Sequence, residues 1–374
     1  MSGDERIDEN TETWPTKYWH ALEDGRVQCD LCPRQCKLKE SQRGLCFVRG
    51  RLGDQVVLTT YGRSSGFCVD PIEKKPLNHF QPGTPTLSFG TAGCNLACKF
   101  CQNWDISKSR EIDTLADGAK PEQVARVAEK LGCRSVAFTY NDPVIFMEYA
   151  IDIASACRDI GISTVAVTAG YISPEPRAEF FRHMDAANID LKSFSEDFYW
   201  NLTKSHLQDV LETLKYVKAE CDTWIELTNL VIPGENDSEG EFDEMSAWVV
   251  EHFGPDVPLH FSAFHPDYRM KDKPATPPET LNLGRRTALK NGVHHAYVGN
   301  VSDRGRASTY CHNCRALLIG RERYNLISWG LSEAGACRQC GTPCAGVFDA
   351  TPGDWGARRL PVRMREFTAE AAPA

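Results

Sequence analysis

The cysteines of this chain are gathered in three clusters, and this clustering constrains the fold more than any other feature. Twelve of the sixteen cysteines lie in residues 29–46, 94–101 and 311–344. Several are paired at the C-x2-C spacing that suits metal ligands. The acidic, polar residues 1–12 do not look like a secretory signal, so the pattern favours metal sites over disulfides. The four scattered cysteines are typical of small buried hydrophobic residues.

The central cluster reads TAGCNLACKFC, with Cys94, Cys98 and Cys101 at C-x3-C-x2-C spacing. Three thiolates can hold three corners of a 4Fe–4S cube, whereas an electron-transfer cluster normally has four. The fourth iron would be open to a ligand that is not protein. Zinc fits poorly, because zinc ligands usually come as C-x2-C pairs that total four. The motif follows the apolar run 86–89 and resembles that of the radical S-adenosylmethionine (SAM) superfamily.

Further segments resemble one family within that superfamily. They are VQCDLCPRQC from Val27, DPIEKKPLNHF from Asp70, CQNW from Cys101, LVIPG from Leu230 and FHPDY from Phe264. Together they are similar to the AmmeMemoRadiSam family, a relative of the glycyl-radical-enzyme activases, over residues 27–347. The resemblance implies reductive cleavage of SAM to a 5′-deoxyadenosyl radical, which abstracts hydrogen from a substrate. It does not identify that substrate, which is expected to be a protein glycine, a peptide or a small molecule.

The resemblance also implies roles for individual residues. The three motif cysteines would hold the cluster, and Phe100 would pack beside it. The residues expected to contact or orient SAM are Tyr140, Asn141, Asp142, Thr168, Gly170, Asp190, Lys192, Ile232, Gly234 and His265. For Ile232 the alternative is core packing, and for His265 it is a role in a turn.

Two positions depart from the family pattern. The family usually has glutamate where this chain has Asp142, and asparagine where it has Ala169. Asp142 keeps a carboxylate that is one methylene shorter, and it could equally cap a helix that begins at Pro143. The pair formed by Asp190 and Lys192 could be a surface ion pair. These departures keep open a second hypothesis, a non-catalytic iron–sulfur carrier or scaffold.

The C-terminal cluster has the layout of a zinc ribbon. Cys311 and Cys314 form one C-x2-C pair, and Cys337 and Cys340 form a second. Such a closed S4 site usually binds zinc and stabilises a module too small for its own core, although a rubredoxin-like iron site has the same ligands. Cys344 would be spare.

The N-terminal cluster, Cys29, Cys32, Cys36 and Cys46, has a less standard spacing. It would hold either zinc or an auxiliary iron–sulfur cluster, and a structural metal is favoured. A third alternative is one metal site shared between N-terminal and C-terminal cysteines.

The segment between the outer clusters alternates strand and helix patterns. Strand-like runs cover residues 86–89, 135–140, 164–168, 187–191, 223–232, 259–264 and 295–298. This alternation predicts an α/β fold, a partial (β/α) TIM-type barrel of the radical SAM type, with a doubly wound open sheet as the alternative. Two capping boxes, Ser238 with Glu241 and Thr276 with Glu279, predict helix starts.

The expected boundaries follow from these patterns. They are a Cys-rich metal-binding lobe at 1–60, the barrel at 61–305, a ribbon-like module at 306–350 and a loosely ordered tail at 351–374.

Composition limits the partners of the chain. A hydrophobic content of 41% and a charged content of 25% are ordinary for a soluble globular protein, and no run approaches the ~18 apolar residues of a membrane span. We therefore expect a cytoplasmic protein with no membrane partner. The formal net charge of −9 disfavours nucleic acid, so RNA modification is the weakest hypothesis. An electron donor such as flavodoxin or ferredoxin is the expected partner.

Overall fold

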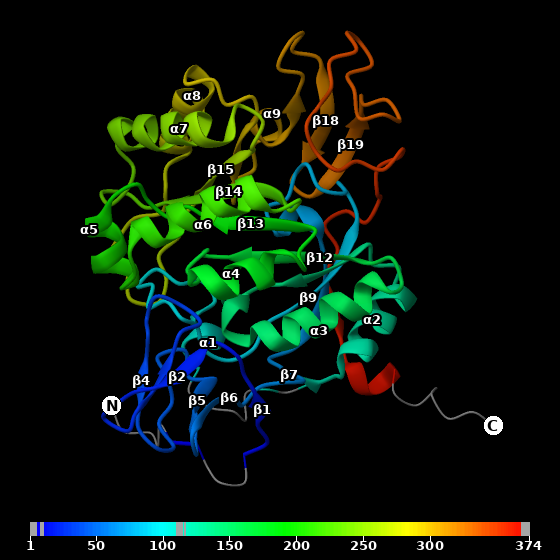
Figure 1. Cartoon of the computed structure of the whole chain (residues 1–374). Coiled ribbons are helices and arrows are strands. Elements are labelled where there is room, and N and C mark those ends of the chain that lie inside the picture. The colour runs from blue at the N-terminus through cyan, green and yellow to red at the C-terminus, as the bar shows by residue number, and fades with distance from the viewer. Residues whose placement is uncertain (1–5, 8–10, 110–114, 116, 368–374) are drawn as a thin grey trace, which may run out of the picture.

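A nine-stranded sheet forms the centre of the molecule (Figure 1). The computed structural model describes residues 6–7, 11–109, 115 and 117–367. The first parallel strand is β9, and the parallel strands follow one another in chain order across the sheet. They are β9 (Pro85–Phe89), β11 (Ser135–Phe138), β12 (Ser163–Thr168), β13 (Ala186–Asp190), β14 (Trp224–Val231), β15 (Leu259–Ala263) and β16 (Ala296–Gly299). This order confirms the partial barrel, because a doubly wound sheet reverses its strand order.

Helices connect the parallel strands, as the sequence pattern predicted. They are α2 (Pro121–Lys130), α3 (Met147–Arg158), α4 (Pro174–Phe181), α6 (Leu207–Glu220), α7 (Glu239–Phe253) and α8 (Pro278–Lys290). In Figure 1, α2, α3, α4 and α6 lie in front of the sheet. Every residue of β11 and of β15 is buried, as expected of parallel strands that are covered on both faces. The carboxyl ends of the parallel strands therefore meet at one edge, where a site can form.

One of the two predicted capping boxes is wrong. Ser238 caps α7 and accepts a hydrogen bond from the Glu241 N–H (3.2 Å). Helix α8, however, has Pro277 at its N-cap with no side-chain hydrogen bond. The Thr276 hydroxyl instead accepts from the Phe264 N–H (2.8 Å) and donates to the Val231 carbonyl (2.5 Å). It ties the ends of β14 and β15 together.

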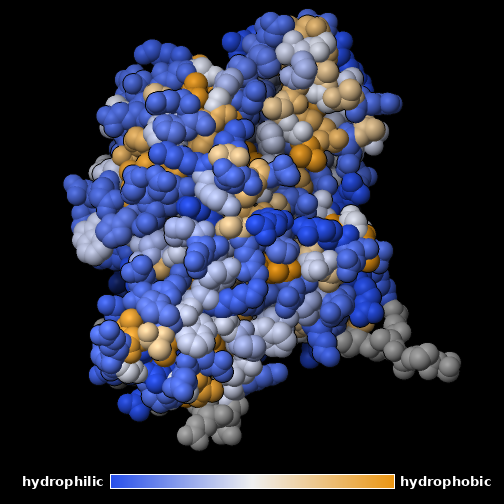
Figure 2. All heavy atoms as spheres, viewed as in Figure 1, coloured by the Kyte–Doolittle hydropathy of each residue, from blue (hydrophilic) through white to orange (hydrophobic). Residues whose placement is uncertain are grey.

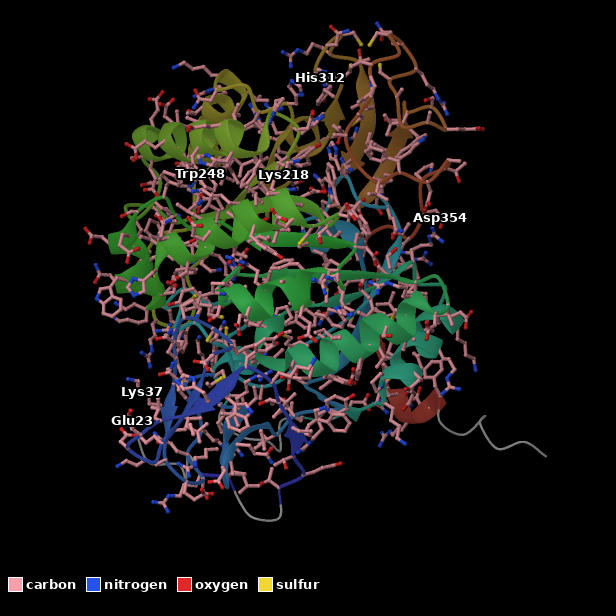
Figure 3. All side chains as sticks on the ribbon, in the orientation of Figure 1. Glu23, Lys37, Lys218, Trp248, His312 and Asp354 are labelled. Atoms are coloured by element: carbon pink, nitrogen blue, oxygen red, sulfur yellow. The ribbon has the colours of Figure 1, made fainter. Side chains whose placement is uncertain are left out.

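Small antiparallel sheets form the N-terminal lobe. One sheet contains β1 (Trp14–Pro15), β6 (Gln55–Leu58) and β5 (Arg49–Leu52), and another contains β2 (Trp19–Ala21), β3 (Val27–Cys29) and β4 (Lys37–Leu38). A short ladder pairs β7 (Arg63–Ser64) with β10 (Asp117–Gly118). Figure 3 shows Glu23 and Lys37 of this lobe at the opposite end of the molecule from His312.

The C-terminal module is a three-stranded sheet of β17 (Thr309–Tyr310), β18 (Leu317–Glu322) and β19 (Asn325–Trp329). Its small core includes the ligand-type cysteines Cys311 and Cys337 themselves. Leu317 and Ile327 stay exposed, and Figure 2 shows hydrophobic side chains gathered over this part of the surface. A small module with cysteines in its core suits stabilisation by a bound metal.

The expectation of a loosely ordered tail is wrong for residues 360–367. Strand β20 (Leu360–Val362) pairs antiparallel with β8 (Phe67–Pro71), and Val362 and Met364 are buried. The physical reason is that β8 would otherwise be an open sheet edge with unpaired backbone groups. Residues 368–374 lie outside the described residues. Among the described residues, no helix has the length and apolar character needed to span a membrane.

A buried carboxylate holds the centre of the sheet to the segment that precedes β9. Glu226 of β14 is fully buried and accepts hydrogen bonds from the backbone N–H groups of Asn78 (2.9 Å) and His79 (2.7 Å). It also accepts from His260 Nε2 (2.7 Å) and Trp224 Nε1 (3.1 Å). Burial opposes the charge, but the hydrogen bond and charge of His260 outweigh it and hold the pKa of Glu226 below its usual value.

The substitution Glu226→Gln should lower the free energy of unfolding by about 2–4 kcal/mol, because an amide nitrogen would face buried N–H donors. The measurement is urea unfolding of the anaerobic protein. Glu212→Gln is the control, because Glu212 is exposed beside Lys215 on α6 and should change stability by less than about 0.5 kcal/mol. Equal effects of the two substitutions would contradict this interpretation.

Candidate functional site

The loop after β9 carries the three motif cysteines into a single cavity. Cys94, Cys98 and Cys101 all line a cavity of about 490 Å³, together with side chains from the carboxyl ends of the parallel strands. This volume lies within the usual range of small-molecule sites. The barrel therefore places the cysteines where its strand ends converge.

Hydrogen bonds from two side chains fix the path of this loop. Asn141 donates to the Gly93 carbonyl (2.7 Å) and accepts from the Thr91 N–H (3.2 Å). Lys108 Nζ donates to the Leu96 carbonyl (2.8 Å). Asn141, which was expected to orient SAM, thus holds the cysteine loop from within the cavity wall.

The thiols of Cys94 and Cys98 are unfavourable to ionise on their own. Burial raises the pKa of Cys94, and it raises that of Cys98 to about 12. Lys108 opposes the shift at both thiols, and Lys192 opposes it at Cys98. Thiolates at these positions therefore need a further cation, which a bound metal supplies.

The spacing of these cysteines fits a cluster better than a single ion. Among the described residues, the cysteine ligand atoms that all lie within 4.8 Å of one another are those of Cys311, Cys314, Cys337 and Cys340. The sulfurs of Cys94, Cys98 and Cys101 are more widely spread. Three separated thiolates around an open cavity suit a 4Fe–4S cluster that leaves one iron for another ligand.

Asp142 is committed to hydrogen bonds at the ends of two strands. One of its oxygens accepts from the Val144 N–H (3.1 Å) and the Thr168 hydroxyl (3.0 Å), and the other accepts from the Ala169 N–H (3.0 Å). It is therefore the N-cap of the short helix Pro143–Phe146, as the alternative interpretation predicted. Burial raises its pKa, although these hydrogen bonds oppose the shift.

Lys192 and Asp190 form an ion pair inside the cavity wall (2.6 Å). Their side chains are only 12% and 32% exposed, so this is not an ordinary surface pair. The ammonium also lies 5.9 Å from the centre of the Phe100 ring. Burial opposes the charge of Lys192, but the ion pair with Asp190 outweighs it and raises the pKa of the ammonium. The chain thus keeps a permanent cation beside the cysteine loop.

Four predicted SAM contacts do not line this cavity. Gly170 has a φ of +66°, and a side chain there would press against Ile189 (3.1 Å). Ile232 is fully buried, in agreement with core packing. Gly234 is exposed, and His265 lines a neighbouring cavity. Phe100, Tyr140 and Thr168 line the cavity as expected, together with the residues already described.

A second ion pair lies in the cavity wall, and no role was expected for it from the sequence. Asp70 pairs with Lys75 (3.0 Å), both almost fully buried, and Lys74 lies 3.4 Å from the same carboxylate. Tyr140 donates its hydroxyl proton to Asp70 (2.9 Å) from a backbone with a φ of +72°. The signal was present in the run DPIEKKP, whose charges directly follow the buried strand β8.

A second cavity of about 520 Å³ adjoins the first. Arg321, Arg323 and Tyr324 of the C-terminal module line it. The residues that line both cavities are Lys74, Pro76, Gln102, Ser262 and Asn300. The C-terminal module therefore forms one wall of a chamber beside the cysteine loop.

The C-terminal cysteines converge on one point. Cys311 and Cys340 are 3.6 Å apart between sulfurs, and so are Cys314 and Cys337. Zinc–sulfur bonds of ~2.3 Å place tetrahedral ligands at about this separation. The four cysteines can hold a single metal ion, without any cysteine from the N-terminal lobe.

Cys344 is not spare. Its sulfur lies 3.8 Å from His79 Nδ1 and 4.0 Å from His295 Nε2, and all three residues are buried. His79 also contacts the Ala345 carbonyl (2.7 Å) and the Tyr297 hydroxyl (2.5 Å), and burial lowers its pKa to about 4. The group joins the C-terminal module to the barrel. Sequence reasoning missed it because its members lie far apart along the chain.

The chain is similar in sequence to known proteins of the radical SAM superfamily. The model of the radical SAM superfamily matches residues 89–245. An uncharacterized protein of Methanocaldococcus jannaschii is 38% identical over 325 residues, which are 87% of this chain and 96% of that protein. The pyruvate formate-lyase-activating enzyme of Clostridium pasteurianum is 27% identical over 42% of this chain and 66% of that protein. The 4-hydroxyphenylacetate decarboxylase activating enzyme of Clostridioides difficile is 22% identical over 54% of this chain and 70% of that protein.

Solved structures show more distant likenesses. A domain of the pyruvate-formate lyase-activating enzyme from Bacteroides vulgatus has a TM-score of 0.39 at 20% identity, covering 44% of this chain and 99% of its own. A radical SAM methyltransferase from Sphaerobacter thermophilus has a TM-score of 0.45 at 13% identity, covering 77% of each chain.

We expect the variant Cys337→Ser to lose about one metal ion per chain, because it removes one of four converging ligands. Total zinc and iron per chain, measured by mass spectrometry, test this. Cys157→Ser is the matched control, since Cys157 is a buried cysteine of α3 that lies outside all three cysteine clusters. Equal metal contents in the two variants would show that the four cysteines do not form the site.

Proposed function

The chain belongs to the radical SAM superfamily, and we propose that it cleaves SAM reductively at a 4Fe–4S cluster held by Cys94, Cys98 and Cys101. When bound, the cluster supplies the electron that breaks a C–S bond of SAM and yields a 5′-deoxyadenosyl radical, which takes hydrogen from the substrate. The observation that carries the proposal is the shared cavity of about 490 Å³, lined by the three cysteines and by polar residues that end β11, β12 and β13.

The residues of the cavity suit a zwitterionic ligand. Lys192 offers a buried cation to the SAM carboxylate, and charge-assisted hydrogen bonds of this kind are among the stronger ones. Asp190 and the network of Thr168 with Asp142 offer acceptors to the amino group. The buried cysteine loop also keeps bulk water away from a reactive radical.

We further propose that the substrate binds in the second cavity. It adjoins the SAM cavity through shared wall residues, and Lys74, Arg321 and Arg323 outnumber the one carboxylate of its lining, Glu73. An anionic small molecule or an acidic peptide segment fits that charge. The similarity to activating enzymes supports a further candidate, a backbone glycine of a partner protein. We propose a protein of the flavodoxin or ferredoxin type as electron donor and zinc as the metal of the C-terminal module.

The anaerobically reconstituted protein should release 5′-deoxyadenosine when given dithionite and SAM. The variant Cys98→Ala should release none above the protein-free background, because its cluster lacks one of three ligands. The measurement is chromatography of the quenched reaction. A fully loaded, reducible protein that releases nothing, and whose electronic spectrum does not respond to SAM, would instead be the iron–sulfur carrier.

Replacing Lys192 by Met should raise the SAM concentration for half-maximal release by about 10–100-fold, as expected for loss of one charge-assisted contact. Lys192→Arg keeps the positive charge and is the matched control. The dependence of release on SAM concentration separates the two variants. An unchanged SAM dependence in Lys192→Met would show that the ammonium contributes no contact to SAM.

A further inference from the structure

The four cysteines of the N-terminal lobe line one small cavity, although their sequence spacing is not standard. Cys29, Cys32, Cys36 and Cys46 line a space of about 20 Å³. The remaining wall is largely apolar and includes Leu31, Leu38, Leu45, Val144 and Ile145. Four thiols around a largely apolar cavity are typical of a metal centre, which could be a single ion or a cluster.

The sulfur spacing separates a single ion from a cluster. A single zinc ion with ~2.3 Å bonds holds its ligands within about 4.6 Å of one another. The C-terminal cysteines satisfy that limit. Within the described part of the chain, which contains all four N-terminal cysteines, no three of their sulfurs lie mutually within 4.8 Å. The N-terminal set thus resembles the widely spread motif cysteines, where each thiolate would bind a different iron.

A buried guanidinium indicates the sign of the charge that this cavity suits. Arg49 is 1% exposed and lines the same cavity. Its Nε donates to the Ile145 carbonyl (2.8 Å) and its Nη2 pairs with Glu148. Its Nη1 has no hydrogen-bond partner within the protein. A buried N–H without an acceptor is costly, and a thiolate-ligated iron–sulfur cluster is an anion whose sulfurs accept such bonds.

The N-terminal cavity lies against the cysteine loop of the SAM site. A Cβ on Gly93 would lie 1.9 Å from the Cys46 carbonyl oxygen, so only glycine permits this approach. Asn95 follows Cys94 directly and lines the N-terminal cavity, and its carbonyl accepts from Arg34 Nε (2.9 Å). The segment 93–95 is therefore a wall common to both sites. On the other side, Cys32 and Cys36 are partly exposed.

We propose that Cys29, Cys32, Cys36 and Cys46 hold an iron–sulfur cluster, not a single metal ion, and that this cluster relays electrons to the SAM site. The reduced N-terminal cluster gives one electron to the oxidised cluster of the motif cysteines and is itself oxidised. A low-potential donor of the flavodoxin or ferredoxin type then returns one electron through the side near Cys32 and Cys36. The relay rests on the proposed function, whereas the cluster site does not.

The site is tested in the full chain with the variant Cys94→Ala/Cys98→Ala/Cys101→Ala, after anaerobic reconstitution. It should retain acid-labile sulfide and about four iron ions, with a paramagnetic signal on reduction. The further changes Cys32→Ser and Cys36→Ser should remove the sulfide and the signal. Absence of acid-labile sulfide from the first variant, with zinc beyond the one ion expected in the C-terminal module or with iron alone, would overturn the cluster. If that variant holds sulfide while the wild-type protein cleaves no SAM, the cluster stands and the proposed function fails.

Potentiometry with paramagnetic resonance then tests Arg49. Arg49→Gln should shift the reduction potential of the N-terminal cluster to a more negative value, because a neighbouring cation favours the reduced state. Arg49→Lys keeps the charge and should shift it less. The motif cluster should keep its potential in both. Equal shifts at the two clusters, or no shift at either, would show that Arg49 does not face the N-terminal cluster.

The relay is tested by comparing two reductants in Cys32→Ser/Cys36→Ser. Release of 5′-deoxyadenosine driven by reduced flavodoxin should fall at least about tenfold further than release driven by dithionite, a small reductant that reaches the SAM site directly. Equal losses with both reductants would overturn the relay and leave the N-terminal cluster a structural one.

Discussion

A buried thiolate is stable only beside a positive charge, and this constraint governs how the chain is built around its sheet. Apart from Cys29, which ends β3, the cysteines of the three sets lie outside the named helices and strands, on segments that cannot hold buried charge in place by themselves. Each segment is fixed by contacts with stiffer parts of the molecule. Asn141 and Lys108 hold the motif loop, and Arg49 lies in the wall of the N-terminal cavity. The parallel sheet supplies the rigidity on which these contacts depend.

The C-terminal module is coupled to the same framework and shapes the site. Arg321 of β18 is buried and donates to the Asn78 carbonyl (2.6 Å) and the Thr309 hydroxyl (2.8 Å). Asn78 is in turn held by Glu226 at the centre of the sheet. A chain of buried polar contacts therefore runs from β14 to the wall of the second cavity. A metal that stabilises the module also keeps Arg321 and Arg323 in that wall.

Local patterns in the sequence were enough to predict the sheet and the three cysteine sets, because periodicity and ligand spacing are short-range properties. These local patterns could not predict contacts between segments that lie far apart along the chain. The pair of Asp70 with Lys75, the group around Cys344 and the pairing of β20 with β8 all join such segments. The loop after β14 does not contact the SAM cavity as expected, for the same reason. Asn236 accepts from the Ile232 N–H (2.6 Å), and Ile232 is fully buried, away from the SAM cavity wall.

Asp142 and Ala169 stand where the resembled family usually has glutamate and asparagine, and one network of hydrogen bonds explains both differences. The short carboxylate of Asp142 receives the Ala169 N–H and the Thr168 hydroxyl, so the strand ends stay together although Ala169 has no polar side chain. Both carboxylate oxygens of Asp142 therefore already accept hydrogen bonds from the protein. The charges available to a zwitterionic ligand come instead from two ion pairs in the cavity wall, Asp190 with Lys192 and Asp70 with Lys75. A ligand that carries both charges can exchange partners with such pairs and leave no buried charge unpaired.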